Sequence, residues 1–141
     1  MLVLDTDHMT PLQWQEGTDF ERLNARLERA GEHEVVTTII SYEEQSRGWL
    51  KYVKGKKNTA QAVEAYRHLS RHLDVYRNIP ALSFDERAAT EFQRLDKLRL
   101  RIGTLDIRIA AIALANNATL LSRNLQHFRK VSGLRVEDWT K

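Results

Sequence analysis

The sequence predicts an α/β fold with a mainly parallel sheet, because short β-branched or apolar runs alternate with longer segments of helical periodicity. The first two of these runs are Leu2–Leu4 and Val35–Ile40. A third observation is the stretch Ile107–Ala115, in which Arg108 is the only side chain that is not apolar. A helix without a polar face is buried nearly all round, so this stretch is expected to be the central helix.

The other helices and strands follow from the same two periodicities. Helices are expected over Met9–Trp14, Phe20–Leu27, Ser41–Lys54, Thr59–Tyr76 and Arg87–Leu100, with a helical turn over Asn124–Phe128. Further strands are expected over Ile79–Leu82, Thr119–Leu121 and Leu134–Val136. Pro80 indicates an edge or the start of its strand, because proline cannot donate a hydrogen bond to a neighbouring strand.

Polar residues are expected to cap several of these helices. Asp7 precedes Met9–Trp14 and can serve as its cap. Ser41 and Glu44 have the spacing of a capping box, and the segment Ser83–Glu86 resembles another. Local roles of the same kind are available to the acids considered below, because Asp5 suits a turn, Glu44 a capping box and Asp106 the positive end of a helix.

Length and composition bound the class of protein. The 141 residues fit one domain over residues 1–141, and the 42% hydrophobic and 29% charged content is that of a soluble globular protein. The absence of cysteine excludes disulfides and thiolate metal sites and favours a cytoplasmic location. No apolar run is long enough for a membrane span, and the apolar start ends at Asp5, too early for a signal peptide.

Basic residues outnumber acidic ones, 22 to 19, and five of them fall within Arg47–Lys57 without an acid among them. Trp49 and Tyr52 are interleaved with them. A solvated helix face has this composition, and so does a surface that contacts phosphates. The two aromatic residues suit either stacking on RNA bases or a protein interface.

Three acids fall at comparable places in the predicted fold. Asp5 ends the first strand, Glu44 lies in the first turn after the second strand, and Asp106 begins the central helix. Carboxylates that converge at one edge of a sheet repel each other, and a divalent cation removes that penalty. Oxygen ligands without histidine or cysteine suit Mg²⁺ or Mn²⁺, so the pattern predicts metal-dependent phosphodiester hydrolysis.

Five motifs in order resemble those of PIN-domain ribonucleases, and most of all the toxin members of VapBC toxin–antitoxin pairs. They are Leu4–Thr6, Ile40–Gly48, Gly103–Ala111, Ser122–Phe128 and Gly133–Trp139. Each motif is weak alone, but the five together span essentially the whole chain. Glu44 rather than Glu43 is the match, because the glutamate of the family precedes the helix glycine, here Gly48, by four positions.

The resemblance implies a three-layer α/β/α fold and a metal-dependent endoribonuclease. It implies that Asp5, Glu44 and Asp106 hold Mg²⁺ or Mn²⁺, with Ser122 and Asn124 beside the site. The Ser122–Phe128 motif often carries one more acid in the family, but here Asn124 and His127 occupy the candidate positions. Asn124 can orient a metal-bound water without adding charge. Asp7 stands where the family often has asparagine and compensates in part.

The same resemblance implies an RNA substrate, a small antitoxin whose tail covers the acidic pocket, and a homodimer. Ser122 and a set of basic residues are the expected substrate contacts. The basic residues are Arg47, Lys51, Lys54, Lys56, Lys57 and Arg123.

Two alternatives remain open from the residues. Asp5 at a strand end also suggests a haloacid-dehalogenase-like phosphatase with an aspartate nucleophile, although Met9 stands where that pattern has a hydroxyl residue and no catalytic lysine is evident. The other alternative is a PIN-like module that binds RNA or protein without catalysis. His68 and His72 have a metal-ligand spacing on one helix but are expected to be exposed helix residues, because no glutamate follows His68 as in metalloproteases.

Overall fold

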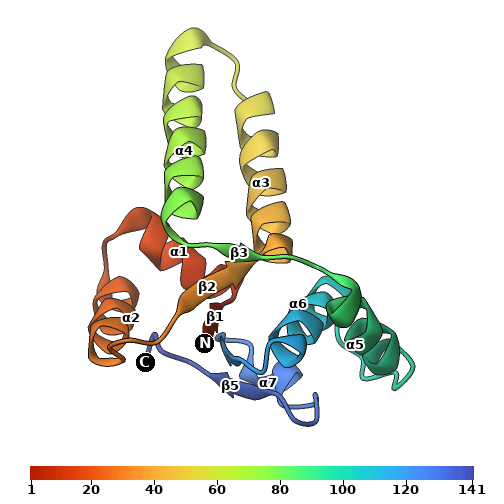
Figure 1. Ribbon diagram of the computed structural model, residues 1–141. Coiled ribbons are helices and arrows are strands. Elements are labelled where there is room, and N and C mark those ends of the chain that lie inside the picture. Colours follow the sequence, from red (N-terminus) through yellow and green to blue (C-terminus); the bar gives the residue numbers. More distant parts are fainter.

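A sheet of five parallel strands forms the middle of the computed structural model, which describes residues 1–141 (Figure 1). The strands are β1 (Leu2–Leu4), β2 (Val35–Thr38), β3 (Ala81–Leu82), β4 (Thr119–Leu121) and β5 (Arg135–Glu137). Their order is β3-β2-β1-β4-β5, and every neighbouring pair is parallel. The first strand therefore lies at the centre, and all five carboxyl ends meet at one edge of the sheet.

Seven helices connect and flank these strands. They are α1 (Thr6–Trp14), α2 (Thr18–Arg29), α3 (Ile39–Lys54), α4 (Thr59–Asn78), α5 (Glu86–Asp96), α6 (Thr104–Ala115) and α7 (Leu125–Phe128). None of them combines the length and the apolar character that crossing a membrane requires.

The two faces of the sheet carry separate hydrophobic cores, because successive side chains of a strand point to opposite faces. Val3 of β1 belongs to a core that includes residues of α5, α6 and α7. Leu2 and Leu4 belong to a second core with Met9 of α1 and Leu23 of α2. Figure 1 shows α1 and α2 on the side opposite α5 and α6. The predicted α/β/α layering is confirmed.

The central helix is α6, as the apolar stretch predicts. Ile107 and the five residues Ile109–Ala113 are each at most 6% exposed. Arg108, the one charged residue, places its guanidinium over the ring of Phe92 in α5 at 5.5 Å, which shields its aliphatic part without burying the charge.

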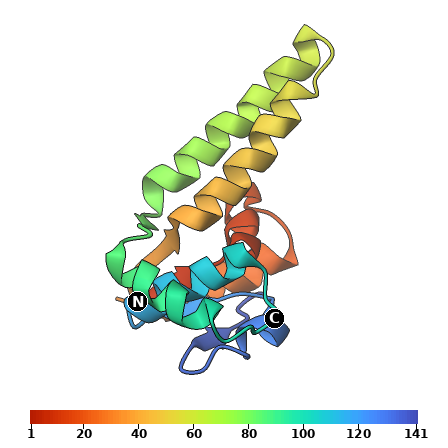
Figure 2. The same ribbon diagram turned by 90° about the vertical axis from the view of Figure 1, so that its right-hand side faces the viewer.

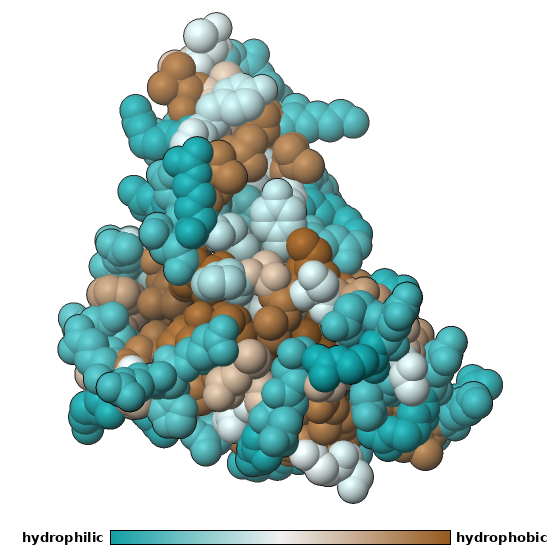
Figure 3. All heavy atoms as spheres, viewed as in Figure 1, coloured by the Kyte–Doolittle hydropathy of each residue, from teal (hydrophilic) through white to brown (hydrophobic).

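Helices α3 and α4 form a hairpin that projects well beyond the rest of the molecule (Figure 2). At its base the Tyr76 hydroxyl donates a hydrogen bond to Gln45 Oε1 at 2.6 Å, which ties the two helices together. Large apolar side chains are exposed along the hairpin (Figure 3), and they include Leu50, Val63, Tyr66 and Leu73.

Two predicted helix starts are wrong in their details. The strand β2 ends at Thr38 rather than Ile40, and the Thr38 side chain caps α3 by accepting a hydrogen bond from Ser41 N at 3.1 Å. The expected Ser41–Glu44 capping box is therefore absent, and Glu44 is released for other contacts. In the same way Asp5 rather than Asp7 caps α1.

The fifth helix also differs from its prediction at both ends. Asp85 caps it through Ala88 N, whereas Ser83 does not, and the helix ends at Asp96 instead of Leu100. Arg99 and Arg101 adopt positive φ angles of 53° and 60°, which helical residues do not. No glycine or proline at these positions marks the end in the sequence.

The expectation that the α4 histidines are exposed fails for both, because the His68 side chain is 16% exposed and stacks on Trp49, and His72 is buried more deeply. Its side chain is 3% exposed, and its Nε2 lies 2.8 Å from Ser46 Oγ of α3. The ring stacks on Tyr42, with a centroid separation of 5.4 Å. Burial lowers the pKa of His72, so this residue is a packing element inside the hairpin.

We expect Thr38→Ala to lower the free energy of unfolding by about 1 kcal/mol, because it removes the acceptor for Ser41 N at the start of α3. Thr38→Ser keeps that hydroxyl and should lose much less. The midpoint of urea unfolding, with an unchanged m-value, measures both. Equal losses in the two variants would mean that the Thr38 methyl group, and not the cap, stabilises this junction.

Candidate active site

The carboxyl ends of the neighbouring strands β1 and β4 bring Asp5 and Ser122 together. The Asp5 side chain is 5% exposed and accepts two hydrogen bonds. One comes from Thr6 N to Oδ1 at 2.7 Å, where Asp5 caps α1, and the other from the Ser122 hydroxyl to Oδ2 at 2.7 Å. Both carboxylate oxygens are therefore fixed in position at the edge of the sheet.

Glu44 and Asp106 reach the same place from helices α3 and α6. The Thr6 hydroxyl donates to Glu44 Oε1 at 3.2 Å, so Thr6 connects Glu44 with Asp5. The amide Nδ2 of Asn124 donates to Asp106 Oδ2 at 3.3 Å. Asn124 is itself placed by its backbone N–H, which donates to Ser122 Oγ at 3.0 Å. The predicted residues from four separate segments thus share one network.

Burial raises the pKa of all three carboxyl groups. For Asp5, burial and then the charge of Asp7 raise the pKa to about 7, and Asp106 adds to this effect. Burial is also the main cause of the raised pKa of Glu44 and of Asp106, and the Asp106 charge contributes at Glu44. Hydrogen bonds from Thr6, Ser122 and Asn124 oppose these shifts only in part.

None of these three acids forms an ion pair with lysine or arginine. The residues do not make a compact three-ligand cage by themselves. Poorly solvated carboxylates that raise each other's pKa values favour a cation between them, and an all-oxygen donor set suits a hard divalent ion.

Asp7 is a fourth acid at this edge. Its Oδ2 accepts a hydrogen bond from Arg123 N at 3.0 Å, and its Oδ1 lies 2.7 Å from His8 Nδ1. The other ring nitrogen of the buried His8 accepts from Trp139 N at 3.1 Å, which assigns the His8 proton to Nδ1. His8 therefore donates to Asp7 and orients its carboxylate.

The basic residues that were predicted to contact substrate are arranged in two places. Arg47, Lys51 and Lys54 follow Glu44 on α3 at spacings of three and four residues, which places them on one helix face. Arg47 is paired with Glu43, whereas Lys51 and Lys54 are exposed and without an ion pair. These two lysines are the available cations on this face.

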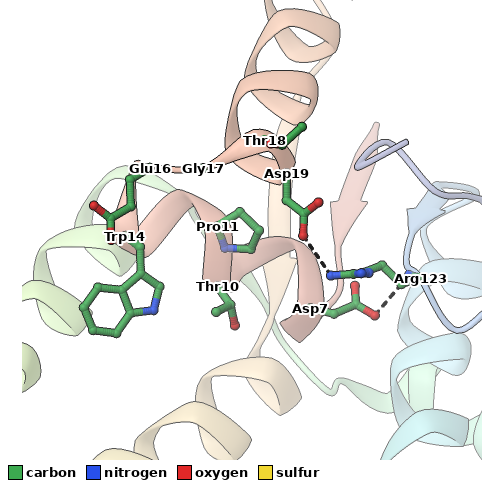
Figure 4. A pocket seen from close by; sticks show the side chains of 9 residues that line it. All are labelled: Asp7, Thr10, Pro11, Trp14, Glu16, Gly17, Thr18, Asp19 and Arg123. Carbon is green, nitrogen blue, oxygen red and sulfur yellow. Dashed lines mark hydrogen bonds and ion pairs between the residues drawn. The ribbon is translucent and has the colours of Figure 1, made fainter.

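Arg123 lies on the other side of the acids. Its guanidinium pairs with Asp19 Oδ2 at 3.0 Å, beside an open pocket of about 570 Å³ (Figure 4). Asp7 lines the end of this pocket near Arg123, and Trp14 lies at its far end.

Thr6 was not singled out as a site residue from the sequence, and His127 was named only as the occupant of a motif position without a role. Thr6 connects two of the acids, and the only signal for it is a hydroxyl residue directly after Asp5. His127 Nδ1 lies 3.1 Å from Asn124 Nδ2, and its charge lowers the pKa of Asp106 against the effect of burial. Its position three residues after Asn124, in a short helix, is the signal.

A family model described as PIN domain matches residues 2–134. This chain belongs to the PIN-domain family. The match covers the carboxylate network and four of the five motifs, so the resemblance to PIN-domain proteins is confirmed. It removes the support for the phosphatase alternative, and no lysine or arginine is among the groups that shift the pKa of Asp5.

Curated relatives of this PIN-domain chain are ribonucleases. Ribonuclease VapC1 of Haemophilus influenzae (strain R2866) is 32% identical over 109 residues, which cover 76% of this chain and 75% of the relative.

Solved structures share the fold over nearly their whole length. VapBC2 from Rickettsia felis, bound to a DNA fragment from its promoter, has a TM-score of 0.75 at 20% identity and covers 98% of each chain. VapBC-1 from nontypeable Haemophilus influenzae has a TM-score of 0.72 at 21% identity, over 99% of this chain and 98% of that one.

Proposed function

We propose that this PIN-domain protein is an endoribonuclease, the toxin of a toxin–antitoxin pair, and that it cleaves RNA with a divalent cation held by Asp5, Glu44 and Asp106. The single observation that carries the metal assignment is the convergence of three poorly solvated acids, none of which forms an ion pair with a lysine or arginine. Carboxylate oxygens without thiolate or imidazole ligands favour Mg²⁺ or Mn²⁺ over zinc.

A bound divalent ion would supply the positive charge that a phosphodiester needs next to these carboxylates, and would make water a stronger nucleophile. The protein contributes orientation. Ser122 and Thr6 hold both oxygens of Asp5, and Thr6 also holds Glu44. Asn124 positions Asp106 through its amide and adds no charge to the site. Asp7, oriented by His8, adds negative charge where Asn124 adds none.

A protein nucleophile is not part of this mechanism. The chain has no cysteine, and the Ser122 hydroxyl donates its hydrogen to Asp5 while its oxygen accepts from Asn124 N. A serine that is occupied in both roles serves better as a positioning group. We propose direct hydrolysis, in which water rather than a protein side chain attacks the phosphodiester.

The proposed protein partner is inferred from the solved structures of similar proteins. Those structures are VapBC complexes, and we propose that this chain likewise pairs with a small antitoxin in the cytoplasm and forms a homodimer. The exposed apolar residues of the α3–α4 hairpin support a protein interface on that element.

Cleavage of labelled total RNA by the purified protein, with Mn²⁺ and with excess EDTA, tests the function. We expect fragments only with the metal. Binding of RNA without cleavage under every metal condition would instead identify a non-catalytic PIN module. Cleavage that continues in EDTA would exclude the metal mechanism.

Substitution of Lys51 and Lys54 by alanine should weaken RNA binding and flatten its salt dependence. Each phosphate contact to single-stranded RNA contributes about 0.7 to the slope of log K against log salt, so the double variant should lose about 1.4. Arg87→Ala, on the exposed face of α5, is the control and should leave the slope unchanged. An unchanged slope in the double variant would exclude this face of α3 as a phosphate contact.

A further inference from the structure

Two successive hydrogen bonds join side chains of α1 to side chains of α3 next to the acidic site. The first pair is Thr6 and Glu44, joined by a hydrogen bond at 3.2 Å. The next is Thr10 and Gln45, one helical turn along α1, with 3.5 Å between Gln45 Nε2 and Thr10 Oγ1. Both Thr10 and Gln45 line a pocket of about 300 Å³ that begins there. This pocket therefore opens directly beside the proposed catalytic groups.

The walls of this pocket are aromatic. Trp14 of α1 and Trp49 and Tyr52 of α3 line it, and all three are only half-buried. The rings of Trp14 and Trp49 meet edge to face with their centroids 6.1 Å apart, and Trp49 and Tyr52 do so at 5.6 Å. The His68 ring stacks on one face of Trp49 with the centroids 5.3 Å apart, and Lys56 lies over the Tyr52 ring, so the opposite face of Trp49 is the surface that a planar ligand could use.

One polar side chain of the pocket has a hydrogen-bond donor without an acceptor. Gln13 lines it and is 4% exposed, yet its amide Nε2 is buried without a hydrogen-bond partner. A buried donor without an acceptor destabilises a protein, so such groups are rare unless a ligand or water completes them. A ligand that enters between α1 and α3 and opens the packing around Gln13 would supply the missing acceptor with the polar edge of a planar ring.

Gly48 keeps the pocket open. It lies inside α3, where glycine is less favourable than alanine, and it lines the pocket. A Cβ built at Gly48 would meet no atom within 4 Å, so the packing of the protein itself does not require glycine there. The missing side chain leaves space beside Trp49 for something outside the chain.

Two cationic side chains, Lys56 and Arg71, lie next to aromatic rings of the pocket. Lys56 Nζ lies 3.6 Å from the centroid of the Tyr52 ring, and the Arg71 guanidinium lies 5.8 Å from that of Trp14. Stacking surfaces flanked by basic residues are the arrangement that single-stranded RNA binding uses, because bases stack while phosphates face the cations.

We propose that this pocket between α1 and α3 binds one nucleobase of the RNA, next to the phosphodiester that is cleaved. The base stacks on the Trp14 and Trp49 rings, and its polar edge faces Gln13. This proposal rests on the proposed function, because the base belongs to the RNA that the acidic site cleaves. The pocket would give that RNA a second point of attachment. One helical turn, about 5.4 Å, separates Glu44 from Gly48 along α3, so a flanking base reaches the pocket while its phosphate lies at the acids.

The first experiment measures binding without cleavage. AMP, GMP, CMP and UMP are titrated in EDTA into a Trp139→Phe protein, whose only tryptophans are Trp14 and Trp49. We expect saturable fluorescence quenching by at least one nucleotide. Gly48→Leu fills the pocket and should weaken this binding by at least about tenfold, the effect of losing one stacked base. Ala60→Leu, which adds the same side chain on an exposed turn of α4, should not.

The second experiment measures RNA cleavage with Mn²⁺. We expect Gly48→Leu to raise KM for short single-stranded RNA about tenfold or more, with a smaller change in kcat, and Ala60→Leu to match the parent. Absence of nucleotide quenching, or quenching and KM that are unchanged in Gly48→Leu, overturns the base pocket while leaving the nuclease intact. A Gly48→Leu protein that loses only binding of a protein partner also overturns it. Quenching that depends on Gly48 in a protein that cleaves no RNA supports the pocket and refutes the proposed function.

Discussion

Asp5→Asn should reduce RNA cleavage by at least about 10³-fold, the largest effect that the site predicts for a single substitution. Asparagine keeps the shape of the side chain but removes a charged ligand from the centre of the network, where Thr6 and Ser122 hold it. A bound metal ion stabilises the charge of the transition state by several kcal/mol, and this stabilisation is lost when the ion is lost. Each 1.36 kcal/mol added to the activation free energy slows the reaction tenfold. Initial rates on labelled RNA with saturating Mn²⁺ measure the loss.

The same substitution should stabilise the protein without metal at high pH. The pKa of Asp5 is about 7 in the folded protein and 3.8 as its ordinary value. The folded state therefore binds its proton more tightly, and wild-type stability falls as pH rises from about 4 through 7. Asparagine removes this penalty, which is of order 4 kcal/mol for a shift of about three pH units, but loses one hydrogen bond worth about 1 kcal/mol. We expect a net gain of about 1–3 kcal/mol near pH 8 and a much smaller one near pH 4.

Thermal unfolding in EDTA near pH 4 and pH 8 measures this gain. Asp96→Asn, at the exposed end of α5, is the matched control and should show no such pH dependence. A stable, folded Asp5→Asn protein that retains a tenth of wild-type activity would remove Asp5 from the catalytic groups. A variant that is destabilised at both pH values would mean that the Ser122 and Thr6 hydrogen bonds outweigh the charge.

Removal of divalent cations should abolish cleavage, and their addition should raise the melting temperature. A ligand at one hundred times its Kd stabilises the folded state by about 2.7 kcal/mol, which corresponds to several degrees for a domain of this size. The effect should grow from pH 5 to pH 8, because protons compete with the cation at Asp5, whose pKa is about 7. Scanning calorimetry with Mn²⁺ or Mg²⁺ and after EDTA treatment measures it.

Two variants give this experiment its controls. Asp106→Asn should lose most of the stabilisation by metal, whereas Asp96→Asn should keep all of it. Equal stabilisation of both variants would place the cation elsewhere on the protein. Unaltered cleavage after complete removal of metal would refute the proposed role of the carboxylates.

Much of this fold was predictable because single segments carry strong patterns. The stretch Ile107–Ala115 is apolar on all sides, and such a segment has nowhere to lie except the interior. The alternation of short strands and helices required parallel pairing, since connections through helices return each strand in the same direction. Pro80 indicated an edge strand, and β3 is indeed one of the two edge strands of the sheet.

Element boundaries were less predictable, because competing preferences overlap there. Val35–Ile40 is β-branched throughout, yet the helix begins at Ile39, since the Thr38 hydroxyl satisfies the first turn of α3. Arg99 and Arg101 take left-handed conformations that neither residue favours by itself. The sequence predicts that His72 is exposed, but the packing of α3 against α4 buries it. In each case contacts made across the fold override the local preference.

For the candidate site, the positions of Asp5, Glu44 and Asp106 after strands or at helix starts were enough to nominate them together. The hydrogen bonds that connect these three residues could not be predicted from the sequence. Thr6 reaches Glu44 across 38 residues of sequence, and the buried His8 is fixed by the backbone of Trp139 at the other end of the chain. No local pattern encodes contacts between segments so far apart.

The central place of β1 has a consequence for synthesis of the protein. Its partner β4 and the residues Ser122 and Asn124 are translated more than a hundred residues after Asp5. A growing chain that still lacks these residues leaves β1 unpaired on one side and the acids without their supporting hydrogen bonds. The hydrogen bonds that support Asp5 and Asp106 therefore form only after the segment that carries β4, Ser122 and Asn124 has joined the sheet.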